Sequence, residues 1–282
     1  MAVNDLTHTN TLAAALNLND GTTYTLLNMG AIYDLRSEVV KATVPRQTPV
    51  AIYQANNMQI RELAIELSVY GATLSAYITN RRALVTHFWP NVRKSGGLGT
   101  LAYTTFNSNV RYATVAFVGL TTGEEWVPNT TAACWGVVTL RFEMLDPTWY
   151  GAAVTPSGTF NANTPVNVSC ANAGDCDAYP TITITGSAVD TVNPQVTDAY
   201  GNVLAISNTI EEDDVLVITC NPNSASITFT PDGGAATSWW GYRTAASVLP
   251  LVKYGTNNLT FVADSGTAAI AISFNSRYSS HG

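Results

Sequence analysis

Residues whose types could support catalysis or metal binding are few in this chain of 282 residues, and they are scattered. The four cysteines form no CxxC pair, and the three histidines lie far from them in the sequence. These residues are Cys134, Cys170, Cys176, Cys220, His8, His87 and His281. The chain also lacks the GxSxG, HExxH, P-loop and GxGxxG patterns. We therefore predict a protein that is not an enzyme, with no catalytic residues, no metal site and no cofactor.

The cysteines leave two interpretations open. Cys170 and Cys176 flank a Gly-Asp loop, and their spacing is compatible with a disulfide. The first residues contain no basic and apolar leader, which favours synthesis in reducing cytosol and free thiols. Cys134 and Cys220 are expected to be small apolar residues within strands.

Three other local features have an ordinary structural interpretation beside a functional one. The acidic run Glu211-Glu212-Asp213-Asp214 fits either a calcium site or an acidic turn before a strand. His87, next to Phe88, is expected to pack or to cap a helix end rather than to act in catalysis. Glycines 96, 97 and 99 precede a strand, so they predict a flexible loop, because a phosphate cradle needs a helix after the glycines.

An aromatic cluster, Trp239-Trp240-Gly-Tyr242, lies in a segment rich in Gly, Ala and Thr. Exposed aromatic rings on a β-domain stack on sugar faces or anchor protein contacts. One of the tryptophans can instead fill the core of the domain. Trp239, Trp240 and Tyr242 are therefore candidate adhesion or sugar-contact residues, with core packing and a protein interface as the alternatives.

Basic residues are concentrated at one place only, at Arg81, Arg82, Arg93 and Lys94, and Trp89 lies between them. Four positive charges in a neutral half of the chain release few counterions, so they do not predict nucleic-acid binding. They fit a solvated surface or a salt bridge between subunits. We treat these five residues as a candidate interface.

Charge is sparse and unevenly distributed. Charged residues make up 12% of the sequence, against about 25% in an average globular domain, while 46% are hydrophobic. The 38 threonines and the 10% of aromatic residues favour strands, which excludes a mostly helical protein. Residues 1–150 have no net charge, and residues 151–282 carry the whole of the −7. A basic nucleic-acid-binding protein is therefore excluded, and no apolar stretch is long enough to predict a membrane span.

The first half of the chain is predicted to combine strands with one helix. Segment 60–71 alternates apolar and polar residues, which indicates a half-buried strand that ends at Gly71. A helix is expected over about 74–88, ended by Pro90, with Arg81 and Arg82 on its exposed side. Its apolar positions are Leu74, Tyr77, Ile78, Leu84, Val85 and Phe88. Strands are expected over 99–106, 110–119 and 136–145, with a loop at 121–131.

A change of pattern after residue 147 divides the chain. Residues 151–165 are rich in Gly, Pro, Asn and Thr, and they are predicted to link a domain at 1–150 to a domain at 166–282. From residue 166 onward, short apolar segments alternate with turn residues, which is typical of a β-sandwich or jelly roll. The expected strands are 166–170, 180–186, 194–199, 202–207, 214–220, 225–230, 247–252, 257–263 and 268–275.

An ordered set of segments extends from residue 61 to residue 278. In the first half these are strand Arg61–Gly71, Arg81-Arg82-x-Leu84 with Pro90, Leu101–Thr105, Arg111–Val115, Leu140–Pro147 and Trp149-Tyr150. In the second half they are Asn172–Asp175, Tyr179–Gly186, Leu249-Pro250, Tyr254–Phe261 and Ile272–Tyr278. In order and spacing, the set resembles the distal tail proteins of long-tailed, non-contractile bacteriophages, which are the hub component at the tail tip.

The resemblance implies a mainly-β fold: an N-terminal split β-barrel-like domain with one helix and a C-terminal galectin-like β-sandwich. It implies a homo-oligomeric ring of six copies at the distal end of the virion tail, assembled in the host cytoplasm. Such a ring joins the tail-tube protein to the tail-tip hub protein, lets DNA pass through its centre and carries receptor-binding proteins or fibres, without membrane insertion. The alternative is a carbohydrate-binding adhesion protein that uses its C-terminal β-sandwich.

Overall fold

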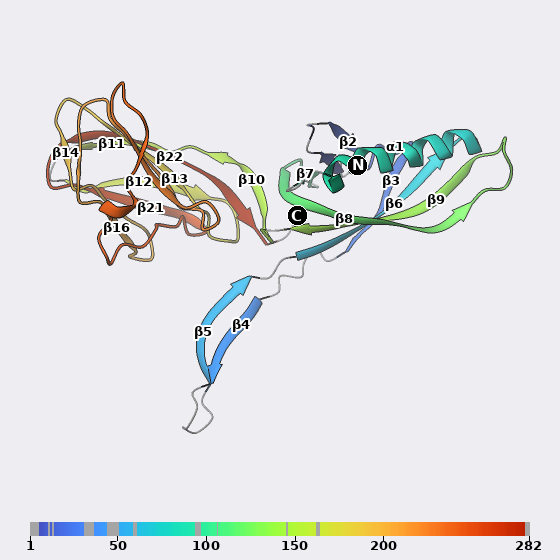
Figure 1. Ribbon diagram of the computed structural model, residues 1–282, viewed down its shortest axis with the longest axis horizontal. Coiled ribbons are helices and arrows are strands. Elements are labelled where there is room, and N and C mark those ends of the chain that lie inside the picture. Colours follow the sequence, from blue (N-terminus) through green and yellow to red (C-terminus); the bar gives the residue numbers. More distant parts are fainter. Residues whose placement is uncertain are drawn as a thin grey trace. The chain divides into compact units, whose positions relative to one another are not determined.

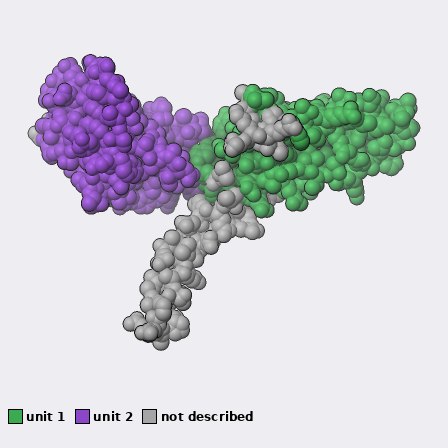
Figure 2. All heavy atoms as spheres, in the orientation of Figure 1, with its two compact units in different colours: residues 1–150, 279–282 green, residues 151–278 purple. Residues whose placement is uncertain are grey.

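The computed structural model describes residues 6–10, 12, 14–30, 37–43, 51–58, 61–93, 97–105, 107–144, 146–161 and 164–279. Side chains at 30, 37–43, 51–58 and 90–93 are outside this description. The chain divides into two compact units, Met1–Tyr150 with Ser279–Gly282, and Gly151–Tyr278 (Figures 1 and 2).

The N-terminal unit is built on one antiparallel sheet. Its strands follow the order β2-β1-β7-β8-β9-β6-β3, so β9 lies between the other two long strands, β6 and β8. Their bounds are β1 Leu6–Thr9, β2 Ala15–Asn17, β3 Tyr24–Gly30, β6 Arg61–Gly71, β7 Leu98–Thr104, β8 Val110–Trp126 and β9 Cys134–Met144. Strands β4 (Ser37–Thr43) and β5 (Ala51–Met58) pair with each other as a separate hairpin. The sheet is open, and the described strands form no closed barrel.

Alternation of apolar and polar residues explains how this sheet is buried. Along β6, the side chains of Leu63, Ile65, Leu67 and Val69 are buried, while the residues between them are half-buried or exposed. Strand β9 alternates in the same way and pairs with β6 over the full length of both. Helix α1 (Leu74–Arg93) lies along the buried face (Figure 1). The predicted strand at 60–71 and the predicted helix after it are thereby confirmed.

The helix differs from its prediction at its end and around its axis. It continues through Pro90 to Arg93, because a proline in the last turn removes only one hydrogen bond, to the carbonyl of Thr86. Its buried face consists of Tyr77, Leu84 and Phe88. Ile78 and Val85, which belong to the same set of apolar positions with helical spacing, are exposed. Each follows a buried residue and therefore lies about 100° farther around the helix.

Strand β8 is longer than its apolar pattern predicted. The expected loop at 121–131 is wrong in its first half, because β8 continues to Trp126 and pairs with β9 as far as Trp126↔Trp135. Two register shifts, after Phe117 and after Thr122, interrupt this pairing. Such irregularities shift the alternation of inward and outward side chains by one residue, so the sequence of the strand no longer shows a regular alternation of apolar and polar residues.

The C-terminal unit contains two antiparallel sheets around one apolar core. One sheet has the order β11-β22-β13-β18-β19-β20 and the other has the order β12-β21-β15-β16. The first comprises β11 Ser157–Asn161, β13 Thr181–Gly186, β18 Val215–Thr219, β19 Ser226–Thr230, β20 Thr237–Ser238 and β22 Thr267–Tyr278. The second comprises β12 Val166–Asn172, β15 Gln195–Thr197, β16 Val203–Ala205 and β21 Gly255–Val262. Strands β14 (Thr191–Val192) and β17 (Thr209–Ile210) form a small extra pair.

The core of this unit takes its side chains from both sheets. Ile184, Leu216 and Ile270 come from the larger sheet, and Val168 and Phe261 come from the smaller one. Burial of such aliphatic and aromatic side chains contributes roughly 1.5–3 kcal/mol each. The arrangement is a β-sandwich, and the mainly-β fold expected from the sequence is confirmed.

Two expectations for this half were wrong. The proposed linker at 151–165 contains the end of β10 (Trp149–Val154) and the whole of β11, which pairs with β22. Gly151, Gly158 and Thr159 occupy regular strand positions, so composition alone was misleading there. Segment 247–252 forms no strand, and only Val252 makes a single bridge, to Ala178.

Candidate functional site

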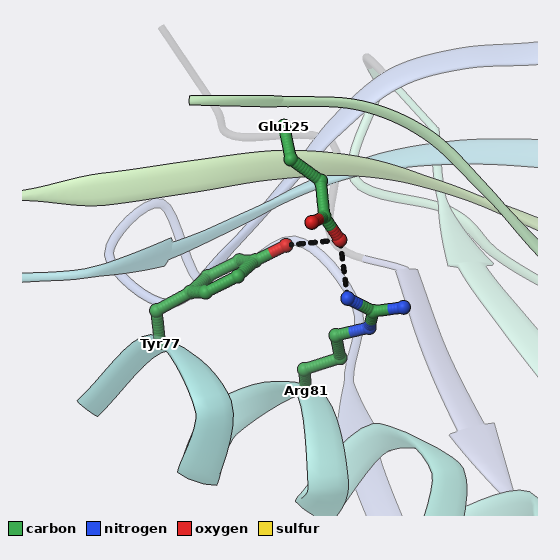
Figure 3. Close-up of polar contacts among 3 residues, drawn as sticks. All are labelled: Tyr77, Arg81 and Glu125. Carbon is green, nitrogen blue, oxygen red and sulfur yellow. Dashed lines mark hydrogen bonds and ion pairs between the residues drawn. The ribbon is translucent and has the colours of Figure 1, made fainter. Parts of the chain in front are cut away.

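Arg81, one of the candidate interface residues, makes its contact within the N-terminal unit. The Tyr77 hydroxyl donates a hydrogen bond of 3.0 Å to Glu125 Oε1, and Arg81 Nη1 forms an ion pair with the same oxygen (Figure 3). Tyr77 and Arg81 come from neighbouring turns of α1, and Glu125 comes from the far end of β8. The three side chains therefore fasten the start of the helix to the sheet.

Two glycines make room for this contact. A Cβ atom at Gly136 would overlap the Tyr77 hydroxyl, and one at Gly71 would overlap the backbone nitrogen of Tyr77. Neither glycine has a positive φ, so close approach of the helix, rather than backbone conformation, accounts for them. Burial raises the pKa of Tyr77, and the neighbouring Glu125 raises it further.

Three of the five candidate interface residues have side chains within the described part of the chain. Arg81 is engaged with Glu125, whereas Arg82 and Trp89 are exposed on the outer face of α1. Arg93 is the last residue of α1, and its side chain is outside the described part of the chain, as is the whole of Lys94. The outer face of the helix instead presents Arg82 and Trp89 together with the exposed Ile78 and Val85.

His87 packs inside the N-terminal unit and pairs with a second histidine. Its Nε2 lies 2.8 Å from Nδ1 of the fully buried His8 on β1. The backbone carbonyl of His87 also accepts a hydrogen bond of 3.0 Å from Asn10 Nδ2. Burial, and next the neighbouring His87, lower the pKa of His8 to about 3, and burial also lowers the pKa of His87. The pair ties the N-terminal strand to the helix.

The aromatic cluster of the C-terminal unit is divided by its surroundings. Trp239 belongs to the sandwich core, where its ring stacks on Phe229 with 3.8 Å between the centroids. The Arg243 guanidinium lies 4.3 Å from the centre of the Trp240 ring. Tyr242 is exposed. Of the three candidate contact residues, Trp239 is thus held inside the domain.

The acidic run is part of a turn, and the two cysteines that flank the Gly-Asp loop are not bonded to each other. Asp214 is buried, and its carboxylate accepts backbone hydrogen bonds from Glu211 and Asp232, which closes the turn before β18. Cys170 and Cys176 are free thiols, so the alternative of a disulfide between them is wrong. Burial raises the pKa of Cys170 to about 11, since an apolar surrounding disfavours the thiolate.

Within the described ranges, no three His, Cys, Asp or Glu side chains are grouped so that they could hold a metal ion. Among the same residues, no helix is both long enough and apolar enough to span a membrane.

Sequence reasoning missed an aromatic row on the open face of the N-terminal sheet. Tyr70, Trp135 and Trp126 are directly paired neighbours across β6, β9 and β8, and all three are exposed. The sequence does contain a signal for this row, because Trp135 lies at one of the outward-facing positions of β9, on the same face as Thr139 and Arg141. A tryptophan on the solvent side of an otherwise alternating strand indicates a contact surface.

Comparisons with known proteins agree with this architecture. Residues 173–278 match the family model of the siphovirus-type tail component, C-terminal domain. The crystal structure of the SPP1 Dit protein, described as a paradigm of the hub adsorption apparatus in phages that infect Gram-positive bacteria, has a TM-score of 0.65. The two sequences are 15% identical, and the match covers 96% of this chain and 98% of that one, so it shows a shared fold.

Two structures of the phage P2 baseplate in its activated conformation, with calcium and with strontium, are also similar. Each is 12% identical with a TM-score of 0.47, and the matches cover 97% and 96% of this chain and 98% of those chains. No curated protein sequence matches the chain.

Proposed function

We propose that this chain forms a ring, with six copies, at the tail tip, as the distal tail proteins that it resembles do; the family match and the shared fold support this proposal. The observation that carries the proposal is the match of residues 173–278 to a tail-component domain, within a chain that has the SPP1 Dit fold over almost its full length. In this role the ring joins the tail-tube protein to the tail-tip hub protein. The genome passes through its centre during ejection.

The composition supports a subunit with extensive protein contacts. Interface cores are depleted in charge and enriched in aromatic residues and arginine. This chain has 12% charged residues, 10% aromatic residues, and 10 arginines against 3 lysines. The acidic excess belongs to residues 151–282, so the N-terminal unit, which we assign to the ring, has no net charge. Neighbouring copies of that unit therefore meet without strong mutual repulsion.

The remaining parts of the proposal concern adhesion and location. The C-terminal sandwich offers a platform for receptor-binding proteins or fibres, and the protein is placed at the distal end of the virion tail after assembly in the host cytoplasm. The role is structural, and it needs neither catalysis nor a cofactor.

The partners supply the test of this proposal. The purified protein is mixed with the tail-tube protein and the hub protein of the same phage, and the mixtures are examined by size-exclusion chromatography and negative-stain electron microscopy. We expect density that caps the tube ends and a separate complex with the hub protein. Absence of association with both partners would contradict the proposal.

A second candidate function, carbohydrate adhesion by the sandwich, is favoured by a different set of aromatic residues from the one the sequence suggested. Tyr200 and Tyr254 are both exposed, and the Lys253 amine lies 5.2 and 5.5 Å from the centres of their rings. The Tyr200 hydroxyl donates to the Asp177 carboxylate at 2.9 Å, which fixes its ring at the surface. Rigid exposed rings beside a carboxylate and an amine suit a sugar face and its hydroxyls.

A glycan array together with a host cell-wall pull-down tests this second function. We expect binding by the natural chain, loss of at least tenfold in Tyr254→Ala, and no change in Val189→Ala, which alters an exposed residue elsewhere in the unit. No binding by the natural chain, or binding that survives Tyr200→Ala and Tyr254→Ala, would exclude it.

A further inference from the structure

The first two strands cover one edge of the main sheet in the N-terminal unit. We call β1, Asn10, β2 and Leu18 the strap; its strands follow the order β2-β1-β7, so β1 pairs with the edge of β7. Leu6 and Leu18 are fully buried, and the Leu18 nitrogen donates a hydrogen bond of 2.7 Å to the Leu6 carbonyl. Because the strap lies at the end of the strand order, it can detach while β6, β8 and β9 stay paired.

Two side chains of the strap contact the same residue of α1, His87. Nδ1 of His8 lies 2.8 Å from Nε2 of His87, and Asn10 Nδ2 donates a hydrogen bond of 3.0 Å to the His87 carbonyl. Asn10 Oδ1 also accepts hydrogen bonds from the backbone nitrogens of Leu12 and Ala14, at 3.0 and 3.1 Å. The turn between β1 and β2 and the attachment to the helix therefore share one side chain.

The His8 ring occupies an apolar pocket. Its centroid lies 4.7 Å from that of Phe88 and 5.6 Å from that of Phe142, and the side chain is fully buried. A Cβ atom at Gly99 of β7 would overlap His8 Nε2, so this glycine leaves the space that the ring fills. A charged imidazole is costly in such surroundings. Burial, and next His87, lower the pKa of His8 to about 3, so the closed strap holds this ring neutral.

The charges around the pair do not favour an imidazolium. The other ionisable residues with described side chains on the surrounding elements are Tyr77, Arg81 and Arg82 of α1, Tyr103 of β7, Arg111, Tyr112, Glu124 and Glu125 of β8, and Cys134, Arg141 and Glu143 of β9. Glu125 is engaged at the start of the helix, Glu124 is exposed, and Glu143 occupies an outward position of β9. Arg111 shares the inward face of β8 with Ala113, and its positive charge disfavours a second one.

We propose that the strap is an acid-opened cover, which at low pH leaves α1 and β7, exposes the β7 edge and its own two leucines, and leaves the rest of the unit folded. Opening transfers His8 to water, where its ring binds the proton that the closed pocket excludes. The ratio of open to closed chains therefore rises as the pH falls below 6.5. Between pH 7.5 and pH 5, His8 alone raises it about 30-fold. Burial of Leu6 and Leu18 keeps the strap closed at neutral pH.

This inference concerns a single chain and goes beyond the proposed ring, so its failure would leave that proposal unaffected. Hydrogen–deuterium exchange of the full chain, read by mass spectrometry, compares the strap with β6 in the same sample. It is run from pH 7.5 to pH 5, corrected for the intrinsic exchange rate, and repeated in urea below the unfolding transition. Three variants accompany the natural chain: His8→Leu, Gly99→Ala, and Thr9→Val as the control, which changes β1 but keeps both imidazoles.

In the natural chain and in Thr9→Val, the protection of the strap is expected to fall about 30-fold or more from pH 7.5 to pH 5. It is expected to depend weakly on urea, because local opening exposes little surface, whereas exchange in β6 depends steeply on urea. The fall should be at least ten times smaller in His8→Leu. Gly99→Ala, which crowds the His8 ring, should lower protection of the strap at pH 7.5 by at least tenfold.

Two results would overturn the inference. One is equal protection and equal urea dependence of the strap and β6 at every pH, because the strap would then open only with the whole unit. The other is the same pH dependence in His8→Leu as in the natural chain, because groups other than His8 would then control the opening. If His8→Leu does not fold, the urea dependence of the natural chain and the response of Gly99→Ala decide the outcome.

Discussion

His8 on β1 and His87 on α1 share a hydrogen bond, with 2.8 Å between Nδ1 of the first and Nε2 of the second. The His8 side chain is fully buried, and its ring also lies 4.7 Å, between centroids, from the ring of Phe88. One imidazole must donate the proton and the other must accept it, so the pair is stable only while at least one ring is neutral. The attachment of the first strand to the helix therefore depends on pH.

The stability of the N-terminal unit is expected to fall as the pH falls below about 6.5. The pKa of His8 is lowered from 6.5 to about 3 in the folded chain, so the unfolded chain binds more protons throughout this window. The stabilising contribution is complete above pH 6.5 and is lost progressively towards pH 3. Between pH 7.5 and pH 5 the loss from His8 alone is about 2 kcal/mol in the free energy of unfolding. Urea unfolding at several pH values measures it.

The control for this prediction is His8→Leu, which removes the titrating group. This variant is expected to be less stable at pH 7.5, because Nε2 of His87 loses its partner, but to show a flatter pH profile between 7.5 and 5. A variant with the same slope as the natural chain would show that other groups cause the pH dependence.

Gly71→Ala is expected to destabilise the N-terminal unit by about 1–3 kcal/mol, because the new Cβ would overlap the backbone nitrogen of Tyr77 and displace the start of the helix. Gly119→Ala is the matched control, since a Cβ there meets no atom within 4 Å. We expect the control to change the free energy of unfolding by less than about 0.5 kcal/mol. Equal melting temperatures for the two variants would contradict the close approach of helix and sheet.

Glu125→Gln is expected to lower the pKa of Tyr77 without returning it to the ordinary value. Burial, the larger cause of the raised pKa, remains when the carboxylate is removed. The cost in stability is expected to stay below about 1 kcal/mol, because the Arg81 and Glu125 side chains are 34% and 36% exposed and their attraction is screened by water. An NMR titration of the tyrosine ring carbons measures the shift, and an unchanged Tyr77 pKa would contradict the contact.

Trp239→Ala is expected to cost about 3–5 kcal/mol, because it removes a buried ring that stacks on Phe229. Tyr242→Ala changes an exposed side chain and should alter the melting temperature by no more than a degree or two. Differential scanning fluorimetry compares the two variants. Equal losses of stability in the two variants would place Trp239 outside the core. If the expected difference is found, Trp239 variants are unsuitable for tests of sugar binding, because they destabilise the whole domain.

The sequence predicted those elements in which local periodicity and burial agree. Strands β6 and β9 alternate without interruption, and α1 begins at Leu74, soon after β6 ends at Gly71. The short strands of the sandwich were mostly located for the same reason. In all of these elements, the pattern of apolar and polar residues is formed by residues that are close together in the sequence.

The parts that the sequence did not predict depend on partners distant along the chain. Arg81 was assigned to a surface, but its ion pair is with Glu125, which lies in a stretch expected to be a loop. The orientation of α1 decides that Tyr77 is buried and Ile78 exposed, and this depends on which face meets the sheet. Trp239 and Trp240 are adjacent in sequence, yet the first is buried in the core and the second is only half-buried against it.

The mass and shape of the assembled natural chain test the central claim most directly. Mass photometry and negative-stain electron microscopy of the purified protein, alone and with its tube and hub partners, are expected to give a closed ring of about 180 kDa, which corresponds to six chains of 30.0 kDa. A protein that stays at the mass of one chain under all of these conditions, and that shows no ring in the images, would contradict the account.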